Sequence, residues 1–213
     1  MRVLITGFEP FGGEIVNPAL EAVMKIDNKL NHIDVIKAKL PVVFHQSISI
    51  LRQLIELHKP TVVICVGQAG GRTSITLERV GINVDDARIP DNEGNTPVDQ
   101  KINPNGPDAY FSSLPIKAIV SAINESGIPA NISNSAGTYV CNHVLYGLCD
   151  LIASSSLDIK GGFMHVPFAP EQVVKNPGQP SMSVENIVSA IETAIRISCT
   201  VTNDIAVADG STH

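Results

Sequence analysis

The stretch TVVICVG, residues 61–67, is an unbroken apolar run closed by a glycine. A short continuous run of β-branched residues is typical of a strand that is buried on both faces of a parallel sheet. Similar runs recur at residues 2–8, 33–41, 128–135 and 161–167. Segments with helical spacing separate them. This alternation predicts an α/β fold, a three-layer α/β/α sandwich around a mainly parallel (mixed) twisted sheet.

The helical segments are predicted at residues 18–30, 44–58, 116–126, 141–155 and 184–197. The first opens with Asn17 as an N-cap and Pro18 at its first helical position. No internal repeat or linker interrupts the pattern, so residues 1–213 are predicted to form one domain. Residues 199–213 are expected to be a frayed tail, because they offer little to bury.

The composition of the chain limits the classes of partner that the protein is expected to bind. Lys and Arg total 15 against 21 Asp and Glu, a net charge of −6, and no basic run stands out. This argues against nucleic acid and anionic membrane as partners. The N-terminus lacks the apolar region of a signal peptide, and no segment approaches 18 uninterrupted apolar residues. We therefore expect a cytoplasmic protein with no membrane association.

The cysteines follow no metal-binding or disulfide pattern. The chain has no CxxC pair among its four, Cys65, Cys141, Cys149 and Cys199. His143 lies two residues after Cys141, but no second pair completes a zinc site. We expect no metal and no cofactor, and free thiols in a reducing compartment.

Cys141 stands where the strand-like run 128–137 gives way to a helix. One reading is packing, because cysteine is commonly buried. The other is chemistry, because a helix N-terminus favours thiolate and lowers a cysteine pKa. Gly67, residues 133–141 and His165 all fall near predicted carboxyl ends of strands, where open α/β sheets carry their sites. This shared position favours a chemical role for Cys141 over a packing role.

Two further residues complete a candidate triad. A lone strand-end histidine such as His165 is more often structural, but it shares the predicted edge with Cys141. In TSITLERVGINV, residues 73–84, Glu78 has the parity of the later apolar positions and should face inward. A buried carboxylate needs a partner, either His165 or an ion pair with Arg72 or Arg88. The spacing leaves both partners open. His143 should point away from Cys141 on a helix.

Three segments resemble the active-site segments of pyroglutamyl peptidase type I, the pyrrolidone carboxyl peptidases: GQAGGRTSITLERVGIN (67–83), ISNSAGTYVCN (132–142) and FMHVPFAP (163–170). The segments GFEPFGG (7–13) and ARIPDNEGNTP (87–97) also resemble that family. The resemblance spans nearly the whole chain. It implies a cysteine peptidase that removes N-terminal pyroglutamate, with Glu78, Cys141 and His165 as its triad, and a homo-oligomer, a tetramer. Gly81 and Thr96 depart from the usual family residues, Ala and Gln.

The resemblance also suggests how substrate is held. It assigns Phe8 and Phe11 to the substrate pocket, where their rings would hold a flat neutral lactam; without it, ordinary packing is an equal reading. Asn17 and Gln68 are polar candidates that could equally cap or brace a loop. Arg88 and backbone N–H groups near Cys141 are candidates for stabilising an oxyanion.

Two other functions fit some of these residues. A glutaminase-like or small-amide hydrolase would also use Cys and His beside a parallel sheet, but it would recognise a charged amino-acid head group. A redox-sensing ligand module would need a resolving thiol near Cys141. Cys149 lies eight residues on along the predicted helix, about 12 Å away at the helical rise, too far without rearrangement.

Overall fold

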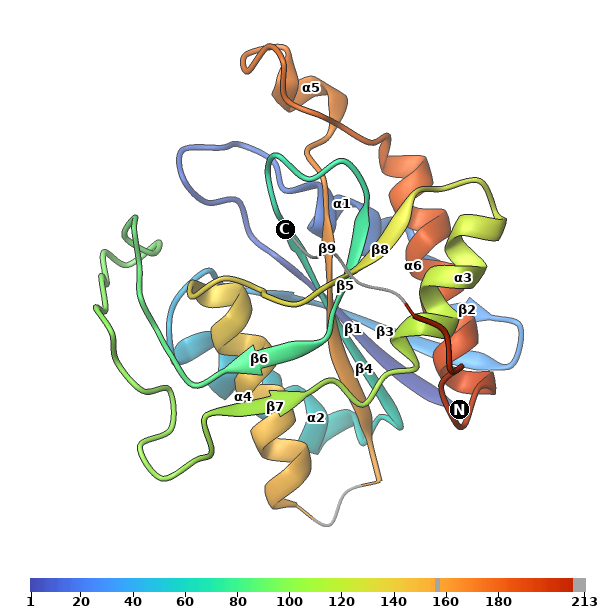
Figure 1. Ribbon diagram of the computed structural model, residues 1–213, viewed down its shortest axis with the longest axis horizontal. Helices are drawn as coiled ribbons and strands as arrows, with labels where there is room; N and C mark the ends of the chain where they lie inside the picture. Colours follow the sequence, from blue (N-terminus) through green and yellow to red (C-terminus); the bar gives the residue numbers. More distant parts are fainter. Residues whose placement is uncertain (156–157, 209–213) are drawn as a thin grey trace.

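The computed structural model describes residues 1–155 and 158–208, which are built around one large sheet (Figure 1). In spatial order its strands are β2 (Lys29–Leu30), β3 (Ile33–Leu40), β1 (Arg2–Phe8), β4 (Val62–Gln68), β9 (Lys160–Val166), β5 (Ile75–Glu78) and β8 (Ala130–Ser133). The opening run TVVICVG supplies the central strand β4, which is buried along its whole length. Burial on both faces explains its unbroken apolar character.

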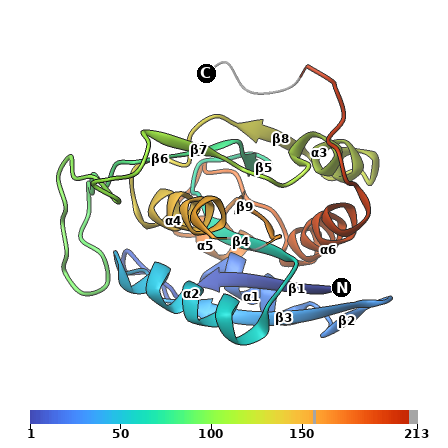
Figure 2. The ribbon, with the colours of Figure 1, turned by 90° about the horizontal axis from the view of Figure 1, so that it is seen from below.

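Helices cover both faces of this sheet. Figure 2 shows α2 (Gln46–His58) and α4 (Val140–Ser154) on one side, with α3 (Ile116–Glu125) and α6 (Val184–Thr200) on the other. The helix α1 (Pro18–Lys25) packs into the same core as α3 and α6. A second core lies between the sheet and α2 and α4. The predicted three-layer α/β/α sandwich is confirmed.

Strand direction divides the sheet into two parts. Strands β3, β1, β4 and β9 run parallel, whereas β5 is antiparallel to β9 and parallel to β8. Gly67 and His165 are register partners at the carboxyl ends of β4 and β9, as expected. The carboxyl end of β8 points the other way, so the expectation that residues 133–141 reach this edge as a strand end is wrong. Residues 134–139 instead lead from β8 across the sheet to α4 (Figure 1).

The segment 73–84 changes sheets at Arg79. Before it lies β5; after it, β6 (Val80–Ile82) pairs antiparallel with β7 (Ala109–Phe111) in a separate two-stranded sheet. The backbone N–H of Arg79 still donates to Ser133 O at 2.9 Å, which ties it to β8. This change of sheet explains the shift in apolar parity within the segment. The predicted burial of Glu78 is confirmed.

Some element bounds differ from the sequence expectation. Helix α1 ends at Lys25, and the last two residues of the predicted segment, Lys29–Leu30, form β2. A short helix, α5 (Pro170–Val173), occurs in the proline-rich segment where none was expected. Asn17 does cap α1, because its side chain accepts from Ala19 N at 3.0 Å.

The C-terminal segment is ordered further along the chain than expected. Helix α6 continues to Thr200, so the predicted start of a frayed tail at 199 is wrong. Beyond the helix, Asp204 accepts from the backbone N–H groups of Lys117 and Ala118 at 3.0 and 2.8 Å. It thereby satisfies two of the free donors at the start of α3. Residues 209–213 lie outside the described residues. Over the described part of the chain, no helix is long and apolar enough to cross a membrane.

Candidate active site

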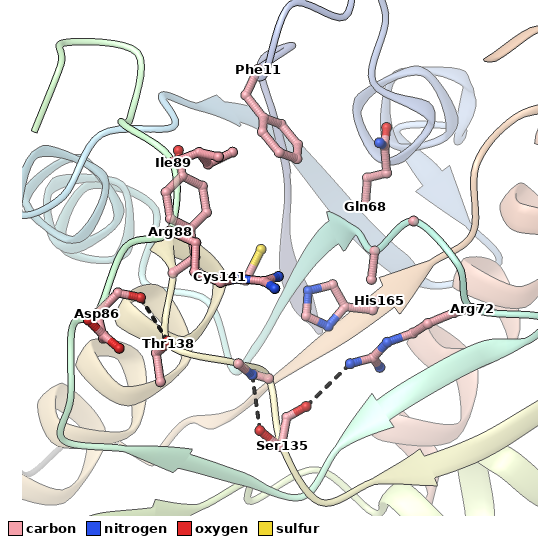
Figure 3. Close-up of a pocket in the computed structure, with 15 residues that line it drawn as sticks. Phe11, Gln68, Arg72, Asp86, Arg88, Ile89, Ser135, Thr138, Cys141 and His165 are labelled. Atoms are coloured by element: carbon pink, nitrogen blue, oxygen red, sulfur yellow. Dashed lines mark hydrogen bonds between the residues drawn. The ribbon is translucent and has the colours of Figure 1, made fainter. Parts of the chain in front are cut away.

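A pocket of about 780 Å³ opens at the carboxyl ends of β4 and β9 (Figure 3). The side chains that line it include Phe11, Gln68, Arg72, Arg88, Cys141 and His165. They come from the loop after β1, the ends of β4 and β9, the loop before β5, the loop after β6, and the start of α4. The pocket therefore gathers residues from every motif that the sequence singled out.

Cys141 is the second residue of α4, after Tyr139 in an extended conformation. Its sulfur lies 3.0 Å from the position that a Cβ on Gly67 would occupy. A side chain at Gly67 would also meet the ring of Phe163 at 2.8 Å, so only glycine leaves room for the sulfur. Because Gly67 is the register partner of His165, the sulfur and the imidazole lie over the same strand pair, and Figure 3 shows them facing the same pocket.

His165 is held from behind by a carboxylate. Its Nδ1 lies 2.7 Å from Oε1 of Glu78, and both side chains are buried. Nη1 of Arg72 donates to the same oxygen at 2.6 Å, and Nη2 donates to Ser135 O at 3.2 Å. The histidine partner and the arginine partner, which the spacing left as alternatives, therefore occur together. With Nδ1 bonded to Glu78, the other ring nitrogen, Nε2, is left for the pocket.

Burial and charge set the protonation of this pair. Burial acts to raise the pKa of Glu78, but the hydrogen bond and charge of His165 and the charge of Arg72 outweigh it, so the pKa lies below its ordinary value. Burial lowers the pKa of His165 below its ordinary value of 6.5, against the opposing hydrogen bond and charge of Glu78. Near pH 7 the imidazole is therefore neutral and Glu78 is ionised. A neutral imidazole can accept a proton.

The thiol of Cys141 behaves differently from the expectation. Burial, followed by the charge of Glu78, raises its pKa to about 12. The lowering expected from the helix N-terminus is therefore not found, because burial and the charge of Glu78 disfavour the thiolate. Cys141 therefore rests as a thiol, and attack through its sulfur would require a base to take the proton. The neutral imidazole of His165, which lines the same pocket, is a candidate for that base.

The other predicted site residues divide into two groups. Phe11, Gln68 and Arg88 line the large pocket, and Figure 3 shows the side chain of Arg88 directed into it. Phe8 and Asn17 do not line it. They line a smaller adjoining hollow, which the pocket meets at Phe11, Gln68, Tyr139 and Cys141.

Phe8 and Asn17 also have structural roles. Phe8 is buried against Phe163, with ring centroids 6.0 Å apart. Besides capping α1, Asn17 donates to Glu9 O at 3.2 Å. Thr96, the departure in the 87–97 segment, is exposed and lines a different hollow. It therefore has no direct part in this site.

Tyr139 is a pocket residue that the sequence reasoning missed. Its ring packs near Phe11, with centroids 6.2 Å apart, and its hydroxyl donates to Pro90 O at 3.0 Å. It lines both the pocket and the smaller hollow. The available signal was its place two residues before Cys141 in a quoted motif, where an aromatic N-cap is unusual.

His143 lies outside both cavities, in keeping with its predicted direction. It is fully buried, with Nδ1 2.7 Å from Asp85, and Nε2 accepts from His45 N at 2.8 Å. All four cysteines are free thiols. Within residues 1–155 and 158–208, no group of three His, Cys, Asp or Glu residues could hold a metal ion.

The arrangement suits nucleophilic attack on a carbonyl carbon. It provides a thiol, a neutral imidazole beside it, and a buried carboxylate that fixes the imidazole tautomer. The first N–H groups of α4 have no partner within the helix and are donors for a developing oxyanion. The same pocket presents aromatic surface and one amide side chain for a substrate.

Comparisons with known proteins agree with this chemistry. The pyroglutamyl peptidase family profile matches residues 1–201. The chain is 57% identical over 212 residues to a pyrrolidone-carboxylate peptidase of Escherichia fergusonii, covering 99% of each chain. It is 53% identical over 210 residues to one from Clostridium botulinum, again covering 99% of each.

Comparison with solved structures agrees with the sequence comparison. The crystal structure of pyroglutamyl peptidase I from Bacillus amyloliquefaciens superposes with a TM-score of 0.95 at 47% identity, covering 97% of this chain and 99% of that one. A mutant pyrrolidone carboxyl peptidase from Pyrococcus furiosus gives 0.91 at 45% identity, with 93% and 98% covered. Sequence and structure agree over almost the whole length, and the chain belongs to the pyroglutamyl peptidase family.

Proposed function

We propose that this protein is a cysteine exopeptidase that hydrolyses the amide bond after an N-terminal pyroglutamyl residue of peptides, through a thioacyl-enzyme on Cys141. The observation that carries the proposal is that Cys141 and His165 line one pocket while Glu78 binds the far side of the imidazole at 2.7 Å. Relatives named pyrrolidone-carboxylate peptidase support the substrate class.

The protons can be followed through the reaction. Nε2 of His165 takes the thiol proton as the sulfur of Cys141 attacks the pyroglutamyl carbonyl carbon. The imidazolium then gives that proton to the departing amine nitrogen as the C–N bond breaks. In the second half, water loses a proton to Nε2 and attacks the thioester, and the proton returns to sulfur as the C–S bond breaks. Glu78 stabilises the imidazolium in both halves.

Two features of the pocket are suited to stabilise the negative charge that develops on the carbonyl oxygen. The N–H groups of Cys141 and Asn142 stand in the first turn of α4, at the positive end of the helix dipole. The guanidinium of Arg88 is a second candidate, since its side chain lines the same pocket. Preorganised donors of this kind stabilise an oxyanion most strongly where water is excluded.

The lactam ring fits the side of the pocket that adjoins the smaller hollow. Phe11 and Tyr139 present aromatic surface there, and Gln68 brings an amide. None of the side chains described as lining the hollow is charged. A flat, neutral ring with one N–H and one C=O therefore matches this surface better than an amino-acid head group does.

The direct test is release of an amine reporter from a pyroglutamyl amide. We expect turnover by the purified protein and its complete loss after alkylation of the thiol. A glutaminyl amide with the same reporter separates the glutaminase-like alternative, which would prefer that substrate. A redox-sensing module would release neither amine. Absence of turnover with the pyroglutamyl amide would refute the proposal.

Replacing Glu78 by glutamine tests its role as the group that orients the imidazole. We expect kcat to fall by about 10³-fold, because Glu78→Gln removes the charge that stabilises the imidazolium. Since Glu78 raises the pKa of His165 and burial lowers it, the acid limb of the wild-type pH profile should lie below pH 6.5 and move lower still in the variant.

The readouts for Glu78→Gln are a pH–rate profile and the rate of Cys141 alkylation. A role confined to pairing with Arg72 predicts an unchanged acid limb and unchanged kcat, and that result would remove Glu78 from the triad. Lys25→Gln is a suitable control, because it breaks an exposed ion pair with Glu185 and neither residue lines the pocket. We expect it to leave kcat unchanged.

We propose further that the enzyme works in the cytoplasm as a homotetramer. Four free thiols suit a reducing compartment. The tetramer rests on the family resemblance, and the mass of the native particle against 22.7 kDa for one chain measures it.

A further inference from the structure

Gln172 is a buried glutamine in α5, outside the pocket lining, whose side chain makes three hydrogen bonds. Its Oε1 accepts from Ala169 N at 3.0 Å, the reach-back that a third helical residue makes to the N-cap. Its Nε2 donates to Oε2 of Glu14 at 3.2 Å and to Oε1 of Gln68 at 3.1 Å. Only 4% of Gln172 is exposed, so these bonds are shielded from water.

The two ends of this chain of hydrogen bonds fix its direction. A backbone N–H such as that of Ala169 can only donate, which makes the facing atom of Gln172 its oxygen. A carboxylate such as Glu14 can only accept, which makes the other atom of Gln172 its nitrogen. The atom of Gln68 that faces Gln172 must then be an acceptor, Oε1. The orientation of the Gln68 amide is therefore determined by its neighbours.

This orientation leaves the nitrogen of Gln68 for the pocket. Within residues 1–155 and 158–208, Nε2 of Gln68 has no hydrogen-bond partner, although only 7% of the residue is exposed. Gln68 lines both the large pocket and the smaller hollow, and Figure 3 shows it together with Phe11. A donor aimed there calls for an acceptor on the substrate, and the lactam C=O is the acceptor that distinguishes pyroglutamate from proline.

We propose that Gln172 is a positioning residue for substrate selection: it holds the Gln68 amide so that Nε2 donates to the lactam carbonyl. This inference rests on the proposed pyroglutamyl peptidase function. Gln172 also binds Glu14, which closes a turn with Phe11 through Glu14 N to Phe11 O at 3.1 Å. The Gln172 side chain thus links the loop that carries Phe11 to the Gln68 amide that would bind the lactam carbonyl.

The packing of the segment agrees with such a role. Phe168, just before α5, packs over Gly70, where a Cβ would collide with its ring. The backbone N–H of Ala69 donates to Val166 O at 2.9 Å. The segment after β9 therefore packs directly against the residues that follow Gln68. This packing brings Gln172 within hydrogen-bonding distance of Gln68.

The test replaces Gln172 by methionine, which keeps length and neutrality but removes all three hydrogen bonds. We expect KM for a pyroglutamyl amide to rise about tenfold, the cost of one misaligned hydrogen bond, with kcat within about threefold of wild type. The ratio of kcat/KM between pyroglutamyl and prolyl amides should fall by the same factor of about ten, because proline has no carbonyl for Gln68 to bind. Gln179→Met, on an exposed glutamine of the same segment, is the control and should change neither quantity.

Gln68→Glu provides an independent second variant. Glutamate at this position still accepts from Gln172 but has no N–H to offer, so kcat/KM for the pyroglutamyl amide should fall. Its carboxylate also places a counter-charge near a prolyl ammonium, so the selectivity ratio should fall by more than it does in Gln172→Met. The melting temperature and the rate of Cys141 alkylation show whether each variant is folded. An unchanged selectivity ratio in a folded Gln172→Met or Gln68→Glu, or an equal rise in KM for both amides, would overturn the inference. Failure of the wild-type protein to cleave any pyroglutamyl amide would instead overturn the proposed function.

Discussion

Replacing Cys141 by serine is expected to lower kcat by more than about 10⁵-fold, as loss of the nucleophile does in other triad hydrolases. A serine hydroxyl is less acidic and far less nucleophilic than a thiol, and the site is built around sulfur. Burial raises the pKa of the Cys141 thiol to about 12, so attack through sulfur requires a base, and we propose that His165 is that base. A hydroxyl would make that proton transfer harder still. Steady-state kinetics on a pyroglutamyl amide measure the loss.

The fold should survive this change, because serine is slightly smaller than cysteine and Cys141 is only partly buried. Cys199→Ser is the matched control, since Cys199 is also a partly buried free thiol, in α6 and away from the pocket. We expect it to keep full activity and to remain sensitive to alkylation. Near wild-type turnover by a folded Cys141→Ser protein would show that another group is the nucleophile.

Selectivity for the lactam is the second large effect that we expect. Prolyl amides should be cleaved with kcat/KM about 10⁴-fold below that of pyroglutamyl amides. Proline has the ring but lacks the carbonyl, so the Nε2 donor of Gln68 would be buried without a partner. Its ring nitrogen is also a protonated amine near pH 7, and the residues lining the smaller hollow provide no counter-charge. A desolvated, unpaired charge costs several kcal/mol, and about 1.4 kcal/mol is tenfold in rate.

Glutaminyl amides provide the matched comparison. They carry a side-chain carbonyl close to that of pyroglutamate, but the free ammonium replaces the lactam nitrogen. We expect little or no cleavage for the same reason of charge. The measurement is kcat/KM for the three amides with one reporter group. Comparable values would refute the pocket as described, even with Cys141 established as the nucleophile.

Local sequence accounts for much of the architecture. The buried runs and the helical spacing between them predict the layers, because burial on both faces demands an apolar run and burial on one face demands a periodic one. The Asn17 and Pro18 pair predicts the start of α1, since capping involves only neighbouring residues. The long motifs around Glu78, Cys141 and His165 identify the family. They lead one to expect that Cys141 and His165 line one pocket and that Glu78 binds the imidazole.

Tertiary structure decided which way β5 and β8 run. Periodicity says that a strand is buried, but its direction depends on which strand it pairs with far along the chain. For this reason, residues 134–139, rather than a strand end, bring Cys141 to the edge where His165 lies. The two partners of Glu78 have the same origin. Spacing could only offer His165, Arg72 or Arg88, whereas the folded chain places both His165 and Arg72 on one carboxylate oxygen.

The protonation of Cys141 and the role of Gln172 also depend on long-range packing. A helix N-terminus is a local feature and argues for a lowered thiol pKa, but desolvation by the surrounding core reverses the sign. Gln172 lies 104 positions from Gln68 and 158 from Glu14 along the chain, so no motif contains the three together. The sequence by itself determined the family, the layers and the candidates for the reacting residues. Only the folded chain decided strand direction, protonation and the aim of the Gln68 amide, because each depends on groups that meet through packing alone.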